Sequence, residues 1–111
     1  MISTLNAEHY IWKEVCHGWH LVKADHLSVI QEQMPPHTAE DRHLHKTVRQ
    51  FFFVLSGQAV LELDGLNHTL RAMEGLEVPP GFPHQMRNDS GADLEFLVVS
   101  SGTARLDRHP A

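Results

Sequence analysis

The sequence is poor in cysteine, in basic residues and in long apolar runs, and each shortage excludes a class of protein. Cys16 is the only cysteine, so no disulfide can form within the chain and nothing indicates an oxidising compartment. The nine lysines and arginines form no cluster, and the formal net charge is −5 with histidine neutral. We therefore expect neither nucleic acid nor an anionic membrane surface as a partner.

No apolar stretch approaches membrane-spanning length, and the first residues lack the basic start and apolar run of a secretion signal. These absences predict a soluble, cytoplasmic protein whose partner is a small molecule or another protein. The 111 residues suffice for one hydrophobic core, so we expect one domain and one site. Histidine, by contrast, is abundant: the ten histidines outnumber the nine lysines and arginines, and histidine is the commonest metal ligand.

Short apolar runs separated by turn residues fill the chain from about Trp19 onward, without helical periodicity. Turns at intervals of roughly ten residues predict an all-β sandwich or barrel, with Ser56-Gly57 and Asp64-Gly65 as hairpin connections. The expected strands are residues 27–34, 41–45, 50–55, 58–63, 67–71, 75–78, 84–88 and 94–100. The expected organisation is an N-terminal extension (1–18), a barrel (19–102) and a C-terminal tail (103–111). The extension is either a short helix or an added edge strand.

The segment EDRHLHKTVRQFFFVLSG, residues 40–57, carries the first candidate ligands. His43 and His45 stand two residues apart, so in a strand both imidazoles point to one face. A corner after His45 would fold Gln50 back beside this pair. Gln50, Phe52 and Val54 would then share one face of the next strand. Gln50 would be a polar ligand, and Phe52 and Val54 would pack in the core.

The segment VPPGFPHQMRN, residues 78–88, supplies a third histidine. Its prolines and Gly81 predict a rigid turn that delivers His84 at the start of a strand, with Met86 on the same face. Three neutral imidazoles and the Gln50 amide oxygen form a ligand set suited to one divalent transition metal, namely Fe, Mn, Ni, Co, Cu or Zn, and poorly suited to Mg or Ca.

Both segments resemble the two motifs of the cupin family, and the chain is similar to a small single-domain cupin. The first motif is matched by His43, His45, Gln50 and Gly57, and the second in full by Pro79, Gly81, His84 and Asn88. The resemblance implies a double-stranded β-helix, or jelly-roll barrel, with a metal inside held by His43, His45, Gln50 and His84.

Three positions depart from the family motifs. His37 and Met73 replace the leading glycines, which are changes in turns, and Gln50 replaces the glutamate ligand. A neutral amide leaves the charge of the ion undiminished, which strengthens it as a Lewis acid and weakens its binding. The same set of three histidines and one glutamine resembles that of cupins that open the ring of unsaturated uronates.

Other interpretations of these residues stay open. Gln50 either binds the metal directly or hydrogen-bonds a ligand imidazole. Phe52, Val54 and Met86 are explained by core packing, and they are also candidates for the wall of a substrate pocket. Cys16, His17 and His20 form a second histidine-rich cluster, for which a core or edge-strand thiol is the simpler reading.

The leading functional hypothesis is a metal-dependent cupin acting on a small oxygenated metabolite. Two chemistries compete: Lewis-acid isomerisation or ring opening of a sugar or keto acid, and dioxygenation. The alternative is a barrel that binds or senses a small molecule without catalysis, which is favoured by the lack of a recognisable general base. Phe51 and Phe53 face outward on the expected strand, and with the resemblance they predict a homodimer.

Overall fold

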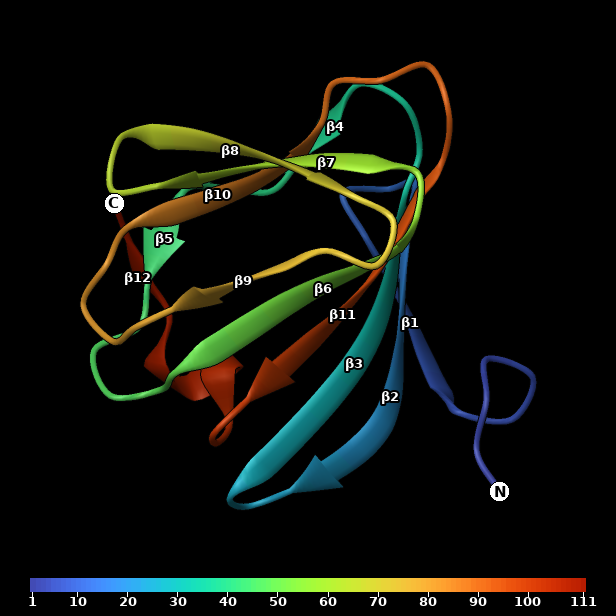
Figure 1. Cartoon of the computed structure of the whole chain (residues 1–111). Coiled ribbons are helices and arrows are strands. Elements are labelled where there is room, and N and C mark those ends of the chain that lie inside the picture. Colours follow the sequence, from blue (N-terminus) through green and yellow to red (C-terminus); the bar gives the residue numbers. More distant parts are fainter.

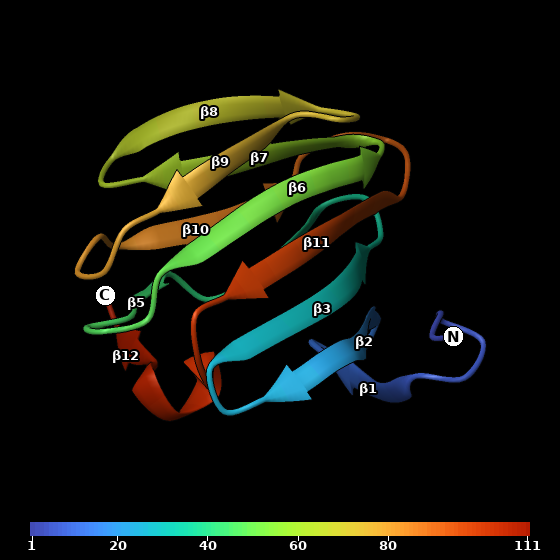
Figure 2. The same ribbon diagram turned by 60° about the horizontal axis from the view of Figure 1, so that its bottom comes forward.

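The computed structural model describes all 111 residues as two antiparallel β-sheets that face each other (Figures 1 and 2). The first sheet has the order β1 (Glu8–Trp12), β2 (Cys16–Ala24), β3 (Leu27–Met34), β11 (Leu94–Ser100), β6 (Gln50–Ser56) and β9 (Gly75–Val78). The second has the order β12 (His109–Pro110), β5 (His43–Leu44), β10 (His84–Asn88), β7 (Gln58–Leu63) and β8 (Leu66–Arg71), with β4 (Thr38–Ala39) paired to β10. The expected all-β jelly-roll barrel is confirmed.

Alternation along the strands explains why the core lies between the sheets. In β6, Gln50, Phe52 and Val54 are buried whereas Phe51 is 40% exposed, as the period of two requires. Each large apolar side chain removed from water contributes roughly 1.5–3 kcal/mol to folding. The fully buried apolar side chains of the core are Cys16, Met34, Val54, Ala59, Leu61, Val78, Met86, Leu94 and Phe96.

Positive φ angles mark the turns that connect these strands. Asp64 and Gly65 have φ angles of 50° and 91°, as the two central residues of a type I′ hairpin require. His37 and Met73 also have positive φ angles, of 61° and 69°. The two positions where the motif glycines are absent therefore keep the left-handed backbone that glycine favours.

The two ends of the chain both join the sheets. Of the two alternatives for the first residues, the structure contains the edge strand: β1 pairs with β2, which begins at Cys16 and pairs with β3. At the other end, a 3₁₀ helix at Ala104–Asp107 leads into β12, which pairs with β5. The limits of the barrel at residues 19 and 102 stay predictions.

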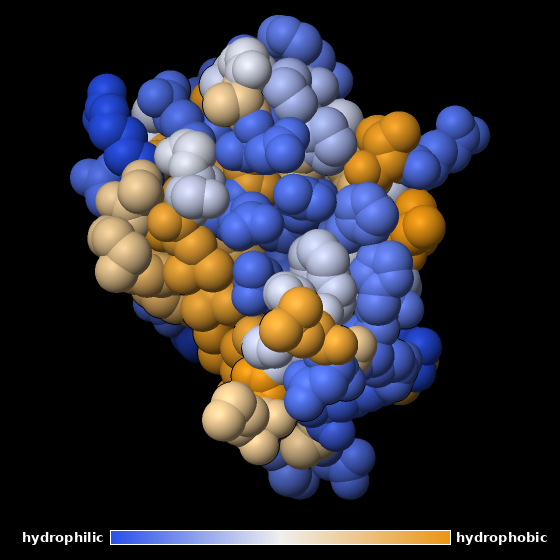
Figure 3. Space-filling view, turned by 90° about the vertical axis from the view of Figure 1, so that its right-hand side faces the viewer, coloured by the Kyte–Doolittle hydropathy of each residue, from blue (hydrophilic) through white to orange (hydrophobic).

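No helix of the structure is long and apolar enough to cross a membrane. On the side of the molecule that carries β1, apolar side chains form a band beside a hydrophilic region (Figure 3). Some apolar side chains thus remain at the surface.

Candidate metal centre and its cavity

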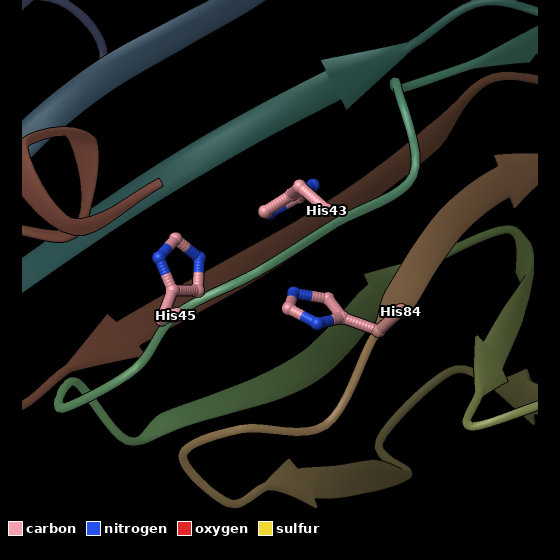
Figure 4. A group of neighbouring side chains, drawn as sticks. All are labelled: His43, His45 and His84. Carbon is pink, nitrogen blue, oxygen red and sulfur yellow. The ribbon is translucent and has the colours of Figure 1, made fainter. Parts of the chain in front are cut away.

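Two neighbouring strands bring the three motif histidines together. His43 lies in β5 directly opposite His84 in β10, and His45 follows β5 by one residue. The three imidazoles point toward one another (Figure 4), and one ligand atom from each lies within 4.8 Å of the others. His84 is fully buried, and His43 and His45 are each 3% exposed.

The proline-rich turn before β10 fixes these positions. Gly81, with a φ angle of 86°, donates its backbone N–H to the carbonyl of His45 at 2.6 Å. The carbonyl of Phe82 lies 3.0 Å from Nδ1 of His84. The turn therefore holds both His45 and His84, which explains how residues nearly forty positions apart share one site.

Backbone carbonyls also set the tautomer of the histidines. Nδ1 of His43 lies 2.7 Å from the carbonyl oxygen of Asp41, and Nδ1 of His45 lies 2.9 Å from that of Asp107. Each Nδ1–H can donate to its carbonyl, which leaves Nε2 unprotonated, as in metal-binding histidines. Nε2 of His45 is buried and has no hydrogen-bond partner. Such an orphaned acceptor is what an ion would satisfy.

Gln50 completes the group from the opposite sheet. Its Nε2 donates to Oγ of Ser100 at 3.1 Å, which turns Oε1 toward Nε2 of His84 at 3.2 Å. A neutral imidazole has one N–H, so His84 can donate to Phe82 or to Gln50 but not to both. A cation bound by Nε2 and Oε1 would resolve this conflict, so the amide fits a metal site.

Burial keeps these imidazoles neutral. Desolvation is the main cause that lowers the pKa of His43 to about 3 and that of His84 to about 4, and it also lowers the pKa of His45. Metal binding requires the unprotonated ring. His43, His45, His84 and Gln50 thus fit a divalent transition metal, with three nitrogen donors and one oxygen donor.

A cavity of about 640 Å³ opens beside these residues, and His43, His45 and Gln50 contribute to its wall. Of the three candidate pocket residues, Phe52 lines the cavity. Val54 and Met86 lie in the hydrophobic core cluster, and the cavity wall does not include them. A role for these two in substrate contact stays a prediction.

The same cavity contains acidic groups that the sequence analysis did not single out. Tyr10, Glu32 and Glu40 line it, and the Tyr10 hydroxyl donates to Oε2 of Glu32 at 2.7 Å. Burial raises the pKa of Glu32 to about 7, and burial followed by the charge of Glu32 raises that of Glu40 to about 8. The sequence of β3 could have indicated that Glu32 faces the interior, because alternation places it on the same face as Ile30 and the buried Met34.

The C-terminal segment adds two further residues. Arg108 lines the cavity, and its guanidinium contacts only the carbonyl of Asp41, at 3.4 Å. The Asp107 carboxylate accepts backbone N–H groups of the loop after His45, which holds its pKa well below the usual range. This loop is therefore fixed by a residue more than fifty positions later.

The second histidine-rich cluster does not converge. Cys16 is buried in the core, while His17 lies with its Nδ1 2.8 Å from Nε2 of His9 on the outer side of β1 and β2. His20 faces the cavity instead. The simpler reading, a core thiol, agrees with this arrangement.

The family model of the cupin domain matches residues 30–100, which is more than half of the chain. The chain therefore belongs to the cupin family. This range contains all four candidate metal ligands, and the jelly-roll barrel with three converging histidines agrees with it.

Two curated relatives and one solved structure illustrate the range of the family. The chain is 29% identical over 89 residues to the H2HPP isomerase of Bacillus subtilis, covering 79% of this chain and 36% of that protein. It is 27% identical over 67 residues to an oxalate-binding protein of Thermotoga maritima, covering 60% and 55%. The chain thus spans only part of the length of these relatives.

The structure of a sugar phosphate isomerase of the cupin superfamily from Silicibacter pomeroyi superposes with a TM-score of 0.81. The two share 21% identity, over 93% of this chain and 76% of the other. Similarity at this level establishes the shared fold.

Proposed function

We propose that this chain is a metal-dependent cupin enzyme that isomerises, or opens the ring of, a small oxygenated metabolite such as a sugar or keto acid. The observation that carries the proposal is the convergence of His43, His45, His84 and Gln50 beside a cavity large enough for a metabolite. The isomerase names of one relative and one structural neighbour support the same class of reaction.

A divalent ion in this site would polarise a carbonyl or hydroxyl oxygen of the substrate. The chain itself would do the remaining work. Phe52 would form an apolar wall against the substrate. The guanidinium of Arg108 has no ion-pair partner and could bind an anionic group of the substrate. Glu32 and Glu40 place groups able to exchange protons in the same cavity. Isomerisation needs proton transfer and no oxidant, so these carboxyl groups favour it over dioxygenation.

The competing proposal is a barrel that binds a small acid without converting it. The name of the oxalate-binding relative supports it, and so does the cationic Arg108 in the cavity wall. Tight stoichiometric binding of a dicarboxylate, with no product and no oxygen uptake in a metabolite screen, would favour this second function.

The first experiment is elemental analysis of protein purified without added metal, in the parent and in the variants His43→Ala and His84→Ala. We expect about one metal ion per chain in the parent and little in both variants. His26→Ala is the matched control, because His26 is exposed in the turn between β2 and β3. A parent that binds none of Fe, Mn, Ni, Co, Cu or Zn after reconstitution would contradict the proposal.

A further inference from the structure

A row of three residues crosses the first sheet from its edge. Tyr10 in β1 pairs with Gly18 in β2, and Gly18 pairs with Glu32 in β3. A Cβ atom at Gly18 would overlap the ring of Tyr10. The missing side chain therefore lets the Tyr10 ring lie across β2, and its hydroxyl reaches Oε2 of Glu32 at 2.7 Å.

This row faces the interior of the cavity. Tyr10 and Glu32 line the same wall as Ser28 and Ile30, and the cavity also includes His43 and His45. Glu32 thus presents its carboxyl group to the space into which the candidate metal ligands point. Met34, two residues further along β3, lies on the same face as Glu32 and is fully buried. A rotation of the strand that turned Glu32 outward would therefore expose Met34 to water.

Glu32 and Glu40 differ in how their oxygens are occupied. Oε1 of Glu40 accepts the backbone N–H of Met86 at 3.1 Å and lies 3.9 Å from Nδ1 of His43. Glu40 is therefore tied to a strand and to a ligand histidine. Glu32 accepts one hydrogen bond, from Tyr10, and a carboxylate has two oxygens. The titratable and charged groups that interact with Glu32 are Tyr10, Arg108, Glu40 and the Cys16 thiol.

We propose that Glu32 is the group that removes and returns a proton during isomerisation of a 2-oxo acid in this cavity, and that Tyr10 positions it. The inference rests on the proposed isomerase function. A proton leaves the carbon next to the carbonyl for the Glu32 carboxylate, the C–H electron pair forms a C=C bond, and the carbonyl oxygen takes the negative charge. Where a C=C bond of the substrate is conjugated with this enolate, the proton returns to the far carbon of that bond, the carbonyl is restored and the C=C bond moves by one position. This isomerisation needs no further reactant.

Burial supports this role, since it places the pKa of Glu32 near 7, where both protonation states are populated at neutral pH. The hydrogen bond from Tyr10 and the charge of Arg108 act in the opposite direction and lower this pKa. The 2-oxo acid class is inferred from Arg108, an exposed residue in the cavity wall whose guanidinium can bind a carboxylate.

The test measures exchange of the carbon-bound protons of 2-oxobutanoate in deuterium oxide by ¹H NMR, with metal-loaded protein. We expect exchange by the parent and a loss of at least about 100-fold in Glu32→Gln. Metal content per chain should be unchanged in this variant. Glu95→Gln is the control: Glu95 lies in β11 outside the cavity, and its substitution should leave exchange at the parent level.

Tyr10→Phe tests the positioning role through the pH profile. Because the Tyr10 hydrogen bond lowers the pKa of Glu32, its removal should move the rise of the exchange rate to higher pH while the fold is kept. Gly18→Ala should cause the same shift by displacing the Tyr10 ring.

Parent-level exchange in Glu32→Gln, or an unshifted profile in Tyr10→Phe, would overturn the inference. So would a parent that binds a full equivalent of metal and exchanges nothing, and in that case the metal site would stand. Absence of both metal and exchange would instead refute the proposed function together with the inference.

Discussion

Nε2 of His84 lies 3.2 Å from Oε1 of Gln50, and the two atoms come from opposite sheets. With the other ring nitrogen facing the Phe82 carbonyl, a neutral His84 cannot satisfy both oxygens. A cation bound by Nε2 of His84 and Oε1 of Gln50 would satisfy both atoms. The Gln50 amide oxygen is therefore expected to affect metal binding.

Substitution of Gln50 tests this dependence. Gln50→Ala removes the amide oxygen and should weaken metal binding about 10–100-fold. Gln50→Glu should tighten binding, because a carboxylate neutralises part of the charge of the ion, and should reduce its Lewis acidity. Competition with a chelator measures both affinities. Equal affinities in the parent and both variants would contradict a direct contact between Gln50 and the metal.

Asp107 should control the position of His45. Its carboxylate accepts the N–H groups of Lys46, Thr47 and Val48, and its carbonyl faces Nδ1 of His45. Asp107→Ala should free this loop and weaken metal binding about tenfold, as loss of an outer hydrogen-bond partner commonly does. The control is Asp89→Ala, which removes an exposed partner of Arg87. Unchanged affinity in Asp107→Ala would show that the loop holds its shape without the carboxylate.

The pH dependence of stability should reflect the Glu40 carboxyl in the metal-free protein. Its folded-state pKa, about 8, lies above the usual value of 4.5, so the folded state holds this proton more tightly than the unfolded state. The stabilisation is complete below about pH 4.5 and is lost as the pH rises through about 8. Glu40→Gln should therefore be more stable than the parent at about pH 9, by roughly 1–3 kcal/mol, and not at about pH 4.

Urea unfolding at both pH values measures this difference in the free energy of unfolding. Glu77→Gln, on an exposed side chain, is the control and should show no such pH dependence. An advantage of Glu40→Gln that is equal at both pH values would rule out the titration of Glu40 as its cause.

Met73→Gly should stabilise the protein by about 0.5–1 kcal/mol. Met73 is 69% exposed and has a φ angle of 69°, so its side chain contributes little packing while its Cβ strains the left-handed backbone. Met73→Ala keeps the Cβ and should give no gain. Thermal and urea unfolding of the three proteins would settle the point, and a gain from alanine equal to that from glycine would refute the backbone explanation.

The predicted homodimer depends on Phe51 and Phe53, whose rings stack with centroids 6.1 Å apart on the outer side of β6. Sedimentation at micromolar concentration should give twice the chain mass, and Phe51→Ser should reduce it to that of the monomer. Leu66→Ser, at a residue that is 64% exposed in β8, is the control and should stay dimeric. A monomeric parent would refute the prediction.

Much of the fold was predictable from alternation and turn composition. The strands at 27–34, 58–63, 75–78, 84–88 and 94–100 have the predicted bounds, because apolar residues at every second position and glycine or proline at the ends specify a strand locally. An edge strand was one of two alternatives for the first residues, and β1 is that strand, whereas β2 was not predicted, since strands of mixed polarity carry a weak pattern. The pairing of β12 with β5 depends on contacts distant in sequence.

The sequence by itself determined the candidate metal ligands, because the spacing of His43 and His45 and the proline-rich turn before His84 are local properties of the chain. Only the tertiary structure decided what surrounds them. Tyr10, Glu32 and Arg108 come from opposite ends of the chain, and no spacing relates them to the histidines. They face one cavity because the sheets close over it, and burial there gives Glu32 a pKa that no local pattern encodes.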